Sequence, residues 1–196
     1  MDLVFICMIP YGIIDRWLCY VHLNLNIILP KYLMSDIQHK NDLKLRGELY
    51  RVGVVGLGFV GGAMYRSFQE KGVSVYGYDK YKEGGVGDLE TCLKCGILFL
   101  CLPTLYDKEA KEYDKCAIEE VLSALQDAGY GGTVVLKSTI EPGVMNDACC
   151  TRFDKLNLVH NPEFLTARTA YHDFHNQMHI VLGRSVNCDN EHFNRL

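Results

Sequence analysis

The chain has 196 residues, of which 48% are hydrophobic and 22% are charged, with a formal net charge of −4 at pH 7. The length accommodates one domain or slightly more, and the negative charge without a basic stripe gives no electrostatic case for a nucleic-acid partner. The nine cysteines are odd in number and irregularly spaced, which favours a reduced, cytoplasmic chain over a disulfide framework.

Residues 1–47 differ in character from the rest of the chain. Their first apolar run is interrupted by Asp15 and Arg16, well short of the ~20 apolar residues that a membrane span needs. A basic start and a small-residue cleavage site, which a signal peptide needs, are not evident. We expect an atypical extension outside the core, with the domain proper over residues 48–196, and hypothesise that the native start is Met34.

The stretch 50–82 has the layout of a dinucleotide-binding unit. Residues 51–55 predict a short buried strand, the six residues GLGFVG follow it directly, and a helix is expected through about Gln69. Residues 73–78 then predict a second strand that ends at Asp79. A strand, a glycine turn, a helix, a strand and an acid form the pattern of a Rossmann-type unit.

Each glycine of that turn has a physical role in this interpretation. Gly56 permits the tight turn, Gly58 lets the backbone approach a pyrophosphate, and Gly61 lets the helix lie close to the sheet. The free amides at the helix start then receive the phosphates. Asp79 is placed to bind the adenosine ribose hydroxyls and would repel a 2′-phosphate, so the predicted cofactor is NAD rather than NADP.

Strands and helices continue to alternate after Asp79. A loop leads to a short helix that Asp88 caps, and a longer helix begins at Asp114 and ends at Gly129. Further strands are predicted at 97–101, 133–137, 156–159 and 179–182, and a helix from Pro142 carries Val144, Met145, Ala148 and Cys149 on one face. This alternation predicts an α/β fold with a doubly wound, mostly parallel sheet.

Two clusters invite a redox or metal interpretation. Cys92 and Cys95 form a CxxC pair, but a second pair at zinc spacing is missing from the sequence, so we expect buried, inert thiols. His172, His175 and His179 would converge only in a continuous helix, and we expect this segment to pass from a helix into a strand. No metal is expected.

Polar groups follow three successive strands where ligands bind in such sheets. They are Leu102–Thr104, Ser138–Thr139 and Asn161–Leu165. Any one of them alone would more often be a turn or a cap, but three in succession favour a site.

These segments carry a resemblance to a known family. VGVVGLGFVGGAM, then LPT, KSTIEPG and HNPEFL, resemble in order and spacing the NAD-binding half of the UDP-glucose/GDP-mannose dehydrogenases over roughly residues 50–185. The resemblance implies an NAD-dependent oxidoreductase that oxidises the C6 alcohol of a UDP-glucose-like sugar to the carboxylate, through a cysteine thioester and with two NAD⁺. By position, it implies cofactor contacts from Gly56, Leu57, Gly58, Phe59, Val60, Gly61, Asp79, Leu102, Pro103, Thr104, Ser138 and Thr139.

The resemblance also implies two catalytic residues. Thr139 would help to position a water or the reacting hydroxyl, and Glu163 would act as a general base or orient the water that hydrolyses the thioester. A carboxylate beside a nicotinamide in a closed cleft is a plausible base. The alternative for Glu163 is a carboxylate at a helix start, stabilised by the helix dipole.

The chain also departs from the family pattern. The family's second acid after NPEFL and the glycine that follows are replaced by Ala167 and Arg168, and the stretch 79–89 is short, so one helical element is expected to be reduced. The resemblance places the nucleophilic cysteine, the central helix and the substrate domain after Leu196. We therefore expect a cofactor-binding fragment, inactive by itself, that forms the family's homodimer only with the absent part.

Two alternatives stay open. One is a catalytically inactive NAD-binding remnant or regulatory module, favoured by the missing acid and nucleophile. The other is a β-hydroxyacid dehydrogenase of the 6-phosphogluconate type, which shares the glycine-rich opening but differs at the NPEFL and KSTIEPG segments. The expected partner is a nucleotide-sugar substrate, with neither nucleic acid nor membrane.

Overall fold

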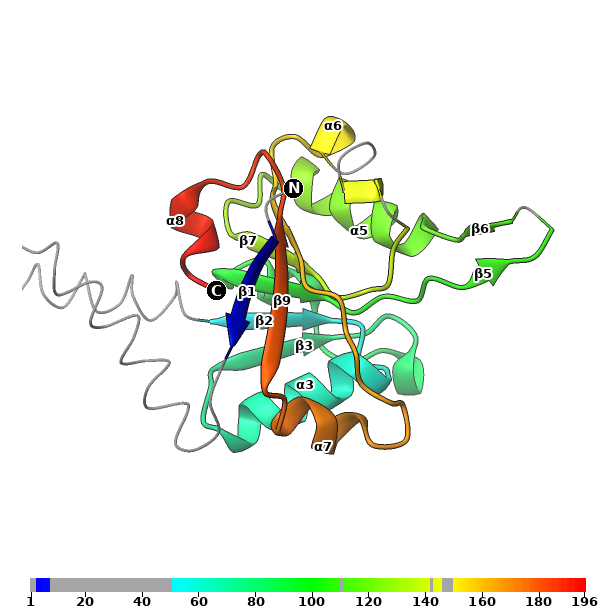
Figure 1. Ribbon diagram of the computed structural model, residues 1–196, viewed down its shortest axis with the longest axis vertical. Helices are drawn as coiled ribbons and strands as arrows, with labels where there is room; N and C mark the ends of the chain where they lie inside the picture. The colour runs from blue at the N-terminus through cyan, green and yellow to red at the C-terminus, as the bar shows by residue number, and fades with distance from the viewer. Residues whose placement is uncertain (1–2, 8–50, 110, 142, 146–149) are drawn as a thin grey trace, which may run out of the picture.

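A computed structural model describes residues 3–7, 51–109, 111–141, 143–145 and 150–196. Within these ranges a seven-stranded sheet has the order β1-β9-β8-β7-β4-β2-β3 (Figure 1). Its strands are β1 (Leu3–Cys7), β2 (Val52–Val55), β3 (Val75–Tyr78), β4 (Ile97–Leu100), β7 (Thr133–Leu136), β8 (Asn157–His160) and β9 (His179–Arg184). The five from β3 to β8 in this order are parallel, whereas β9 and β1 pair antiparallel. The predicted doubly wound, mostly parallel sheet is confirmed.

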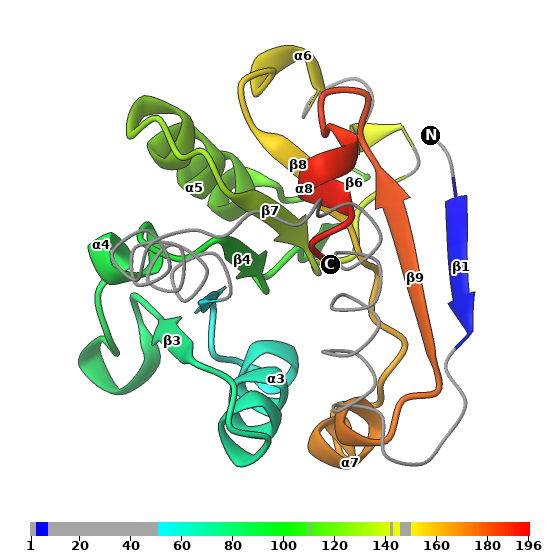
Figure 2. The same cartoon turned by 90° about the vertical axis from the view of Figure 1, so that its left-hand side faces the viewer.

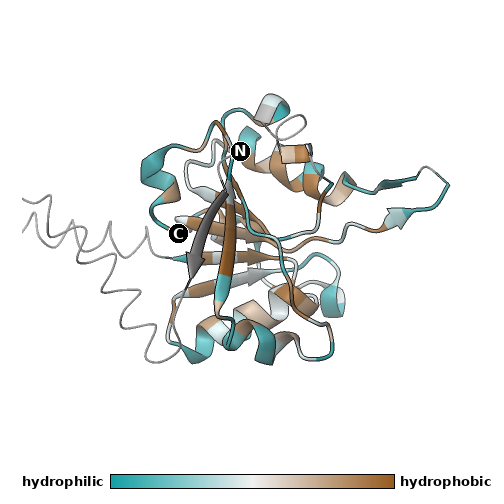
Figure 3. Cartoon of the chain, in the orientation of Figure 1, coloured by the Kyte–Doolittle hydropathy of each residue, from teal (hydrophilic) through white to brown (hydrophobic). Residues whose placement is uncertain are grey.

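Helices cover both faces of the sheet (Figure 2). On one face lie α3 (Phe59–Glu70) and α7 (Ala170–His175), which pack against each other; α4 (Leu89–Cys92) and α5 (Cys116–Asp127) cover the other. Two short helices, α6 (Cys150–Arg152) and α8 (Asn190–Phe193), follow along the chain. The strand side chains alternate between the two apolar clusters, as Val54 and Val55 do, so burial on both faces explains the continuous apolar runs. Figure 3 shows these apolar strands at the centre.

The order of the strands creates a topological switch point in the sheet. Strand β3 pairs with one side of β2 and β4 with the other, so the chain reverses its direction across the sheet between them. Ligands of open α/β sheets bind at such a switch point, beyond the carboxyl ends of the strands. The glycine turn directly follows β2, which puts it at this point.

The helix signals read from the sequence agree with the structure. The Asp88 carboxylate caps α4 by accepting from the amides of Glu90 and Thr91. Gly129 has a positive φ of 65° directly after the end of α5. At the start of α5 the cap position is Lys115, one residue later than predicted, although the Asp114 carboxylate accepts from the Cys116 amide.

The segment between β3 and α4 is short, and whether it is reduced relative to the family stays a prediction. It holds a 3-10 turn, η1 (Lys82–Gly84), and an isolated bridge between Asp79 and Val86. A ribbon that the sequence did not predict, β5 (Tyr106–Asp107) with β6 (Glu112–Tyr113), projects from the sheet between β4 and α5 (Figure 1). Its strands have two residues each, too short for an alternation of polar and apolar residues to show.

The amino-terminal segment differs in part from its expected place outside the core. Residues 3–7 form β1, which pairs with β9 in the register Leu3↔Gly183 to Cys7↔His179. Residues 8–50 and the expected helix positions Pro142, Ala148 and Cys149 lie outside the described residues, and the boundary at 47 and 48 stays a prediction. Within the part of the chain that the structure describes, no helix is long and apolar enough to cross a membrane.

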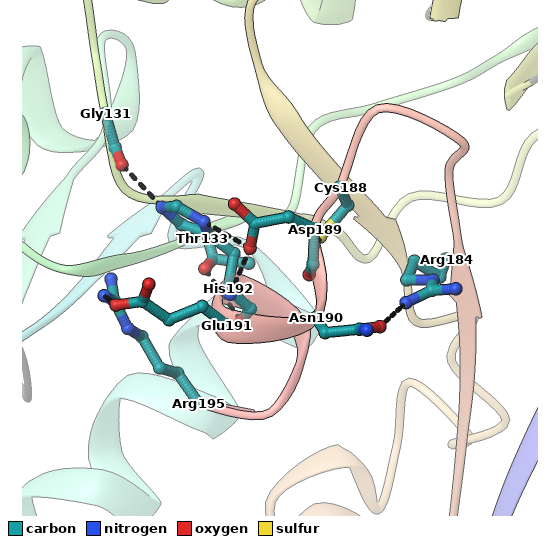
Figure 4. A network of polar contacts seen from close by, with 9 residues as sticks. All are labelled: Gly131, Thr133, Arg184, Cys188, Asp189, Asn190, Glu191, His192 and Arg195. Atoms are coloured by element: carbon teal, nitrogen blue, oxygen red, sulfur yellow. Dashed lines mark hydrogen bonds and ion pairs between the residues drawn. The ribbon is translucent and has the colours of Figure 1, made fainter.

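Helix α8 is fixed beside the amino end of β7 by a polar network (Figure 4). The Asp189 carboxylate accepts from the His192 amide at 2.8 Å and lies 2.8 Å from Nδ1 of the same residue. The other ring nitrogen of His192 lies 3.0 Å from the carbonyl oxygen of Gly131, and the Thr133 hydroxyl donates to the His192 carbonyl. These contacts tie the carboxyl-terminal helix to the start of β7.

Candidate functional site

The glycine turn has the shape that a dinucleotide requires. Gly56 has a φ of +87°, and a Cβ there would lie 2.4 Å from the Cys101 carbonyl oxygen. A Cβ on Gly61 would lie 1.8 Å from the Gly56 carbonyl oxygen, so α3 passes too close to the turn for any side chain. At Gly58 a Cβ would meet no atom within 4 Å, so this glycine leaves open space on the outside of the turn.

The start of α3 offers backbone donors to that space. Gly58 is the N-cap and has no side chain to cap the helix, and the first turn contains no acidic residue. Backbone amides at a helix start, together with the positive end of the helix dipole, suit a phosphate group. The residues present therefore fit a pyrophosphate at Gly58.

Asp79, at the end of β3, is bound to the same turn. Its Oδ2 accepts from the Leu57 amide at 2.8 Å, and its Oδ1 accepts from the amides of Tyr81 and Lys82, each at 2.9 Å. Burial by itself would raise the pKa of Asp79, but these three amides and the Lys82 ammonium lower it overall. An ionised carboxylate has about four acceptor sites, so Oδ2 retains capacity for a ribose hydroxyl.

Lys82 contacts the glycine turn and was not among the predicted site residues. Its ammonium donates to the Leu57 carbonyl oxygen at 2.8 Å, which brings a cation to the outside of the glycine turn. The signal was a basic residue three positions after Asp79 in the short segment.

The hydroxyls predicted after β4 and β7 bind the two strand ends to each other. Ser138 accepts from the Leu102 amide at 2.9 Å and donates to the Leu102 carbonyl at 2.7 Å, and Thr104 donates to the Thr139 carbonyl at 2.8 Å. The Ser138 proton is thus used within the protein. The side chains of Pro103 and Thr139 are exposed and remain available to a ligand.

Glu163 forms an ion pair inside the protein. Its Oε2 lies 2.5 Å from the ammonium of Lys137, and the exposed fractions of the two side chains are 11% and 2%. Residues 161–166 are not helical and α7 begins at Ala170, so the alternative of a helix-start carboxylate is wrong. Lys137 was missed as a site residue, although a lysine at the end of an apolar strand was its signal.

The structure thus assembles the predicted residues into two groups. Asp79 joins the glycine turn at the ends of β2 and β3, while Ser138, Thr104 and Thr139 connect the ends of β4 and β7. Glu163 extends the second group to β8. These groups lie on either side of the switch point, as the two halves of a dinucleotide site do.

The cysteines and histidines take other places. Cys92 and Cys95 are buried and free, and burial raises the pKa of their thiols to about 12 and about 11, so the prediction of buried thiols is confirmed. His172 and His175 lie in α7 and His179 begins β9. Over the described ranges no group of three or more metal-ligating side chains is present.

The fold and the glycine turn define a Rossmann-type dinucleotide-binding domain. Residues 87–196, more than half of the chain, match the model of the UDP-glucose/GDP-mannose dehydrogenase family, NAD binding domain. The chain belongs to that family, and NAD is the cofactor of this domain. The glycine turn and Asp79 precede the matched residues, so the evidence that they bind the cofactor is the geometry of the turn and its contacts with Asp79.

Individual relatives agree with this assignment. Over 94 residues the chain is 30% identical to UDP-glucose 6-dehydrogenase of Campylobacter jejuni. The aligned stretch covers 48% of this chain and 24% of that relative. The chain therefore spans about a quarter of that relative's length.

Solved structures show the shared fold. GDP-mannose dehydrogenase of Pseudomonas aeruginosa matches with a TM-score of 0.55 at 23% identity, over 63% of this chain and 38% of that one. UDP-N-acetyl-mannosamine dehydrogenase of Staphylococcus aureus matches with a TM-score of 0.51 at 20% identity, over 63% and 39%.

Proposed function

We propose that the chain is the NAD-binding portion of an NDP-sugar 6-dehydrogenase. The proposed reaction oxidises the C6 alcohol of a UDP-sugar, of the UDP-glucose kind, to the carboxylate with two NAD⁺. The observation that carries this proposal is the glycine turn, open at Gly58 and bound by Asp79, in a chain of the sugar dehydrogenase family. The family match also argues against the β-hydroxyacid dehydrogenase alternative.

The first task of these residues is to hold the cofactor. The amides at the start of α3 bind the pyrophosphate, and Asp79 accepts from the adenosine ribose. Leu102, Pro103, Thr104, Ser138 and Thr139 line the other half of the proposed NAD site. When bound, NAD⁺ accepts the hydride that leaves the sugar carbon.

The second task concerns water and protons. The side chain of Thr139 is exposed, and its hydroxyl is the group proposed to position a water or the reacting hydroxyl. Glu163 already accepts a hydrogen bond from the Phe164 amide on Oε1 and pairs with Lys137 through Oε2. A carboxylate with both oxygens engaged is well oriented, which supports the role of orienting the hydrolytic water over that of a strong base.

The proposal also includes the cellular compartment, the substrate and the oligomeric state. Five cysteines of the described part of the chain are free, in keeping with the reducing cytoplasm: Cys92, Cys95, Cys101, Cys116 and Cys188. A nucleotide sugar is the proposed substrate, and a homodimer is proposed only for a form that includes the family's central helix.

An inactive NAD-binding module is the second candidate. Ala167 and Arg168, exposed before α7, stand where the family has an acid and a glycine, so contacts made by that acid are missing. The missing acid would have made cofactor or substrate contacts, so its loss favours this candidate, while the intact glycine turn does not decide between the two.

The test uses the whole chain. Calorimetric titration with NAD⁺ and, separately, with UDP-glucose measures binding, and the absorbance of NADH measures turnover with both present. Binding of NAD⁺ supports the proposal, and absence of binding contradicts both candidates. If NAD⁺ binds, mixing the chain with the separately expressed second domain of a family member distinguishes them: turnover that requires both polypeptides supports the dehydrogenase, and its absence supports the module.

A further inference from the structure

The pair of Lys137 and Glu163 is fixed by the sheet. Lys137 directly follows β7 and Asn161 directly follows β8, where the Asn161 amide donates to the Leu136 carbonyl at 2.9 Å. The Lys137 ammonium then reaches both the Asn161 amide oxygen, at 3.0 Å, and the Glu163 carboxylate. Asn161 in turn donates to the Val181 carbonyl of β9 at 2.9 Å. The ammonium is thus anchored to three strands.

Burial makes each member of the pair depend on the other. The side chain of Lys137 is 2% exposed, and a buried ammonium without a counter-ion is costly. Its ammonium also faces the ring of Phe174, 5.8 Å away, which adds no negative charge. Glu163 is the carboxylate that forms an ion pair with Lys137 within the described residues. The pair as a whole carries no net charge.

This neutrality matters because of where the pair lies. It stands at the carboxyl ends of β7 and β8, beyond the switch point from the glycine turn and Asp79 that take the pyrophosphate and the adenosine ribose. The nicotinamide of a bound dinucleotide therefore falls in this half of the proposed NAD site. The nicotinamide ring is positively charged in NAD⁺ and neutral in NADH, so a net charge here discriminates between the two forms.

We propose that Lys137 is a positioning residue whose ammonium holds the Glu163 carboxylate and balances its charge at the nicotinamide end of the proposed NAD site. This inference rests on the proposed NAD site. Lys137 then has two effects. Its ammonium fixes the orientation of Glu163, and its charge sets the preference of the site for the oxidised or the reduced cofactor.

The test measures the dissociation constants of NAD⁺ and NADH for the full chain and takes their ratio. Lys137→Met leaves the negative charge of Glu163, so affinity should shift toward NAD⁺ by on the order of tenfold relative to NADH. Glu163→Gln leaves the positive charge of Lys137, and the shift should be of similar size toward NADH. The double variant is neutral again and should return the ratio to that of the wild type.

Two controls separate charge balance from structure. Lys137→Arg keeps the charge and should keep the ratio, whereas Lys115→Met removes the lysine of a more exposed pair with Glu141, 3.2 Å away, and should leave the ratio unchanged. A purely structural role would weaken both cofactor forms equally. If Lys137→Met does not fold, Glu163→Gln and the double variant carry the test.

Three outcomes are distinct. Opposite shifts in the single variants with recovery in the double variant support the inference. A wild-type chain that binds both forms, with a ratio that no variant changes, overturns the inference and leaves the proposed function standing. A folded wild-type chain that binds neither form overturns both.

Discussion

The Leu57 amide donates to the Asp79 carboxylate at 2.8 Å, across 22 positions of the chain. This bond joins the middle of the glycine turn to the end of β3. The acid expected to bind the ribose therefore also holds the turn that binds the pyrophosphate. A change at Asp79 should affect folding stability and cofactor affinity together.

Asp79→Asn should lower both quantities. An amide side chain has one acceptor oxygen, so it cannot accept from Leu57 on one side and from Tyr81 and Lys82 on the other. Leaving a buried amide unpaired should cost about 1–3 kcal/mol of unfolding free energy, and NAD⁺ affinity should fall in the same variant. Denaturant unfolding and calorimetry measure the two effects. Asp127→Asn, the same charge change at the exposed end of α5, is the control, and equal behaviour of the two variants would contradict the prediction.

Gly61→Ala should destabilise the chain by about 1–3 kcal/mol or more, because the new methyl group would meet the Gly56 carbonyl oxygen in close-packed backbone. The matched control is Gly131, which has an ordinary φ and where a Cβ would meet nothing within 4 Å. Gly72 is also in open space, but its φ is positive, so alanine there would be strained. Gly131→Ala should therefore leave the free energy of unfolding within about 0.5 kcal/mol. Chemical denaturation of both variants measures the difference, and a fully stable Gly61→Ala chain would show that the turn is looser than described.

Ser138→Ala should remove the side-chain hydrogen bonds that link the end of β7 to the end of β4. The hydroxyl satisfies both the amide and the carbonyl of Leu102, so its loss should cost about 1–3 kcal/mol of unfolding free energy. Ser123 is exposed on α5 and provides the matched control, since Ser123→Ala removes the same atom without those partners. Denaturant midpoints for the two variants should differ, and identical midpoints would argue that water replaces the Ser138 hydroxyl without loss.

The network at α8 predicts a pH dependence. The backbone amide of His192, followed by its ring, lowers the pKa of Asp189 below its ordinary value of 3.8. The stabilisation from ionised Asp189 is therefore fully present above that ordinary value and is lost as the pH falls through the lower folded-state pKa. The melting temperatures of the wild type and Asp189→Ala should differ near neutral pH and converge in acid. A constant difference at all pH values would contradict the assignment.

Much of the fold follows from local patterns in the sequence. The strands after Arg51, Gly96 and Gly132 are buried on both faces, so they appear as apolar runs, and the turn between β2 and α3 needs glycine for steric reasons that hold in any such fold. The Asp88 cap and the Gly129 stop are equally local. These features were predicted because neighbours in the sequence determine them.

Contacts between distant segments could not be read in the same way. The pairing of β1 with β9 and the antiparallel direction of β9 depend on tertiary packing, and the two-residue strands β5 and β6 carry no periodic signal. Within the site, the roles of Ser138 and Thr104 as ties between strand ends, and the pairing of Lys137 with Glu163, require the strand register. The residue types at the strand ends were predictable, but their partners were not.

The most direct measurement titrates NAD⁺ into the wild-type chain and into Gly58→Ala. We expect the wild type to bind NAD⁺. In Gly58→Ala the new methyl group has open space in the protein, so the unfolding free energy should stay nearly unchanged. The methyl group would meet the pyrophosphate, so binding should weaken by about tenfold or more. Equal affinity of the two chains, or a folded wild-type chain that does not bind NAD⁺, would contradict the placement of the cofactor on this turn.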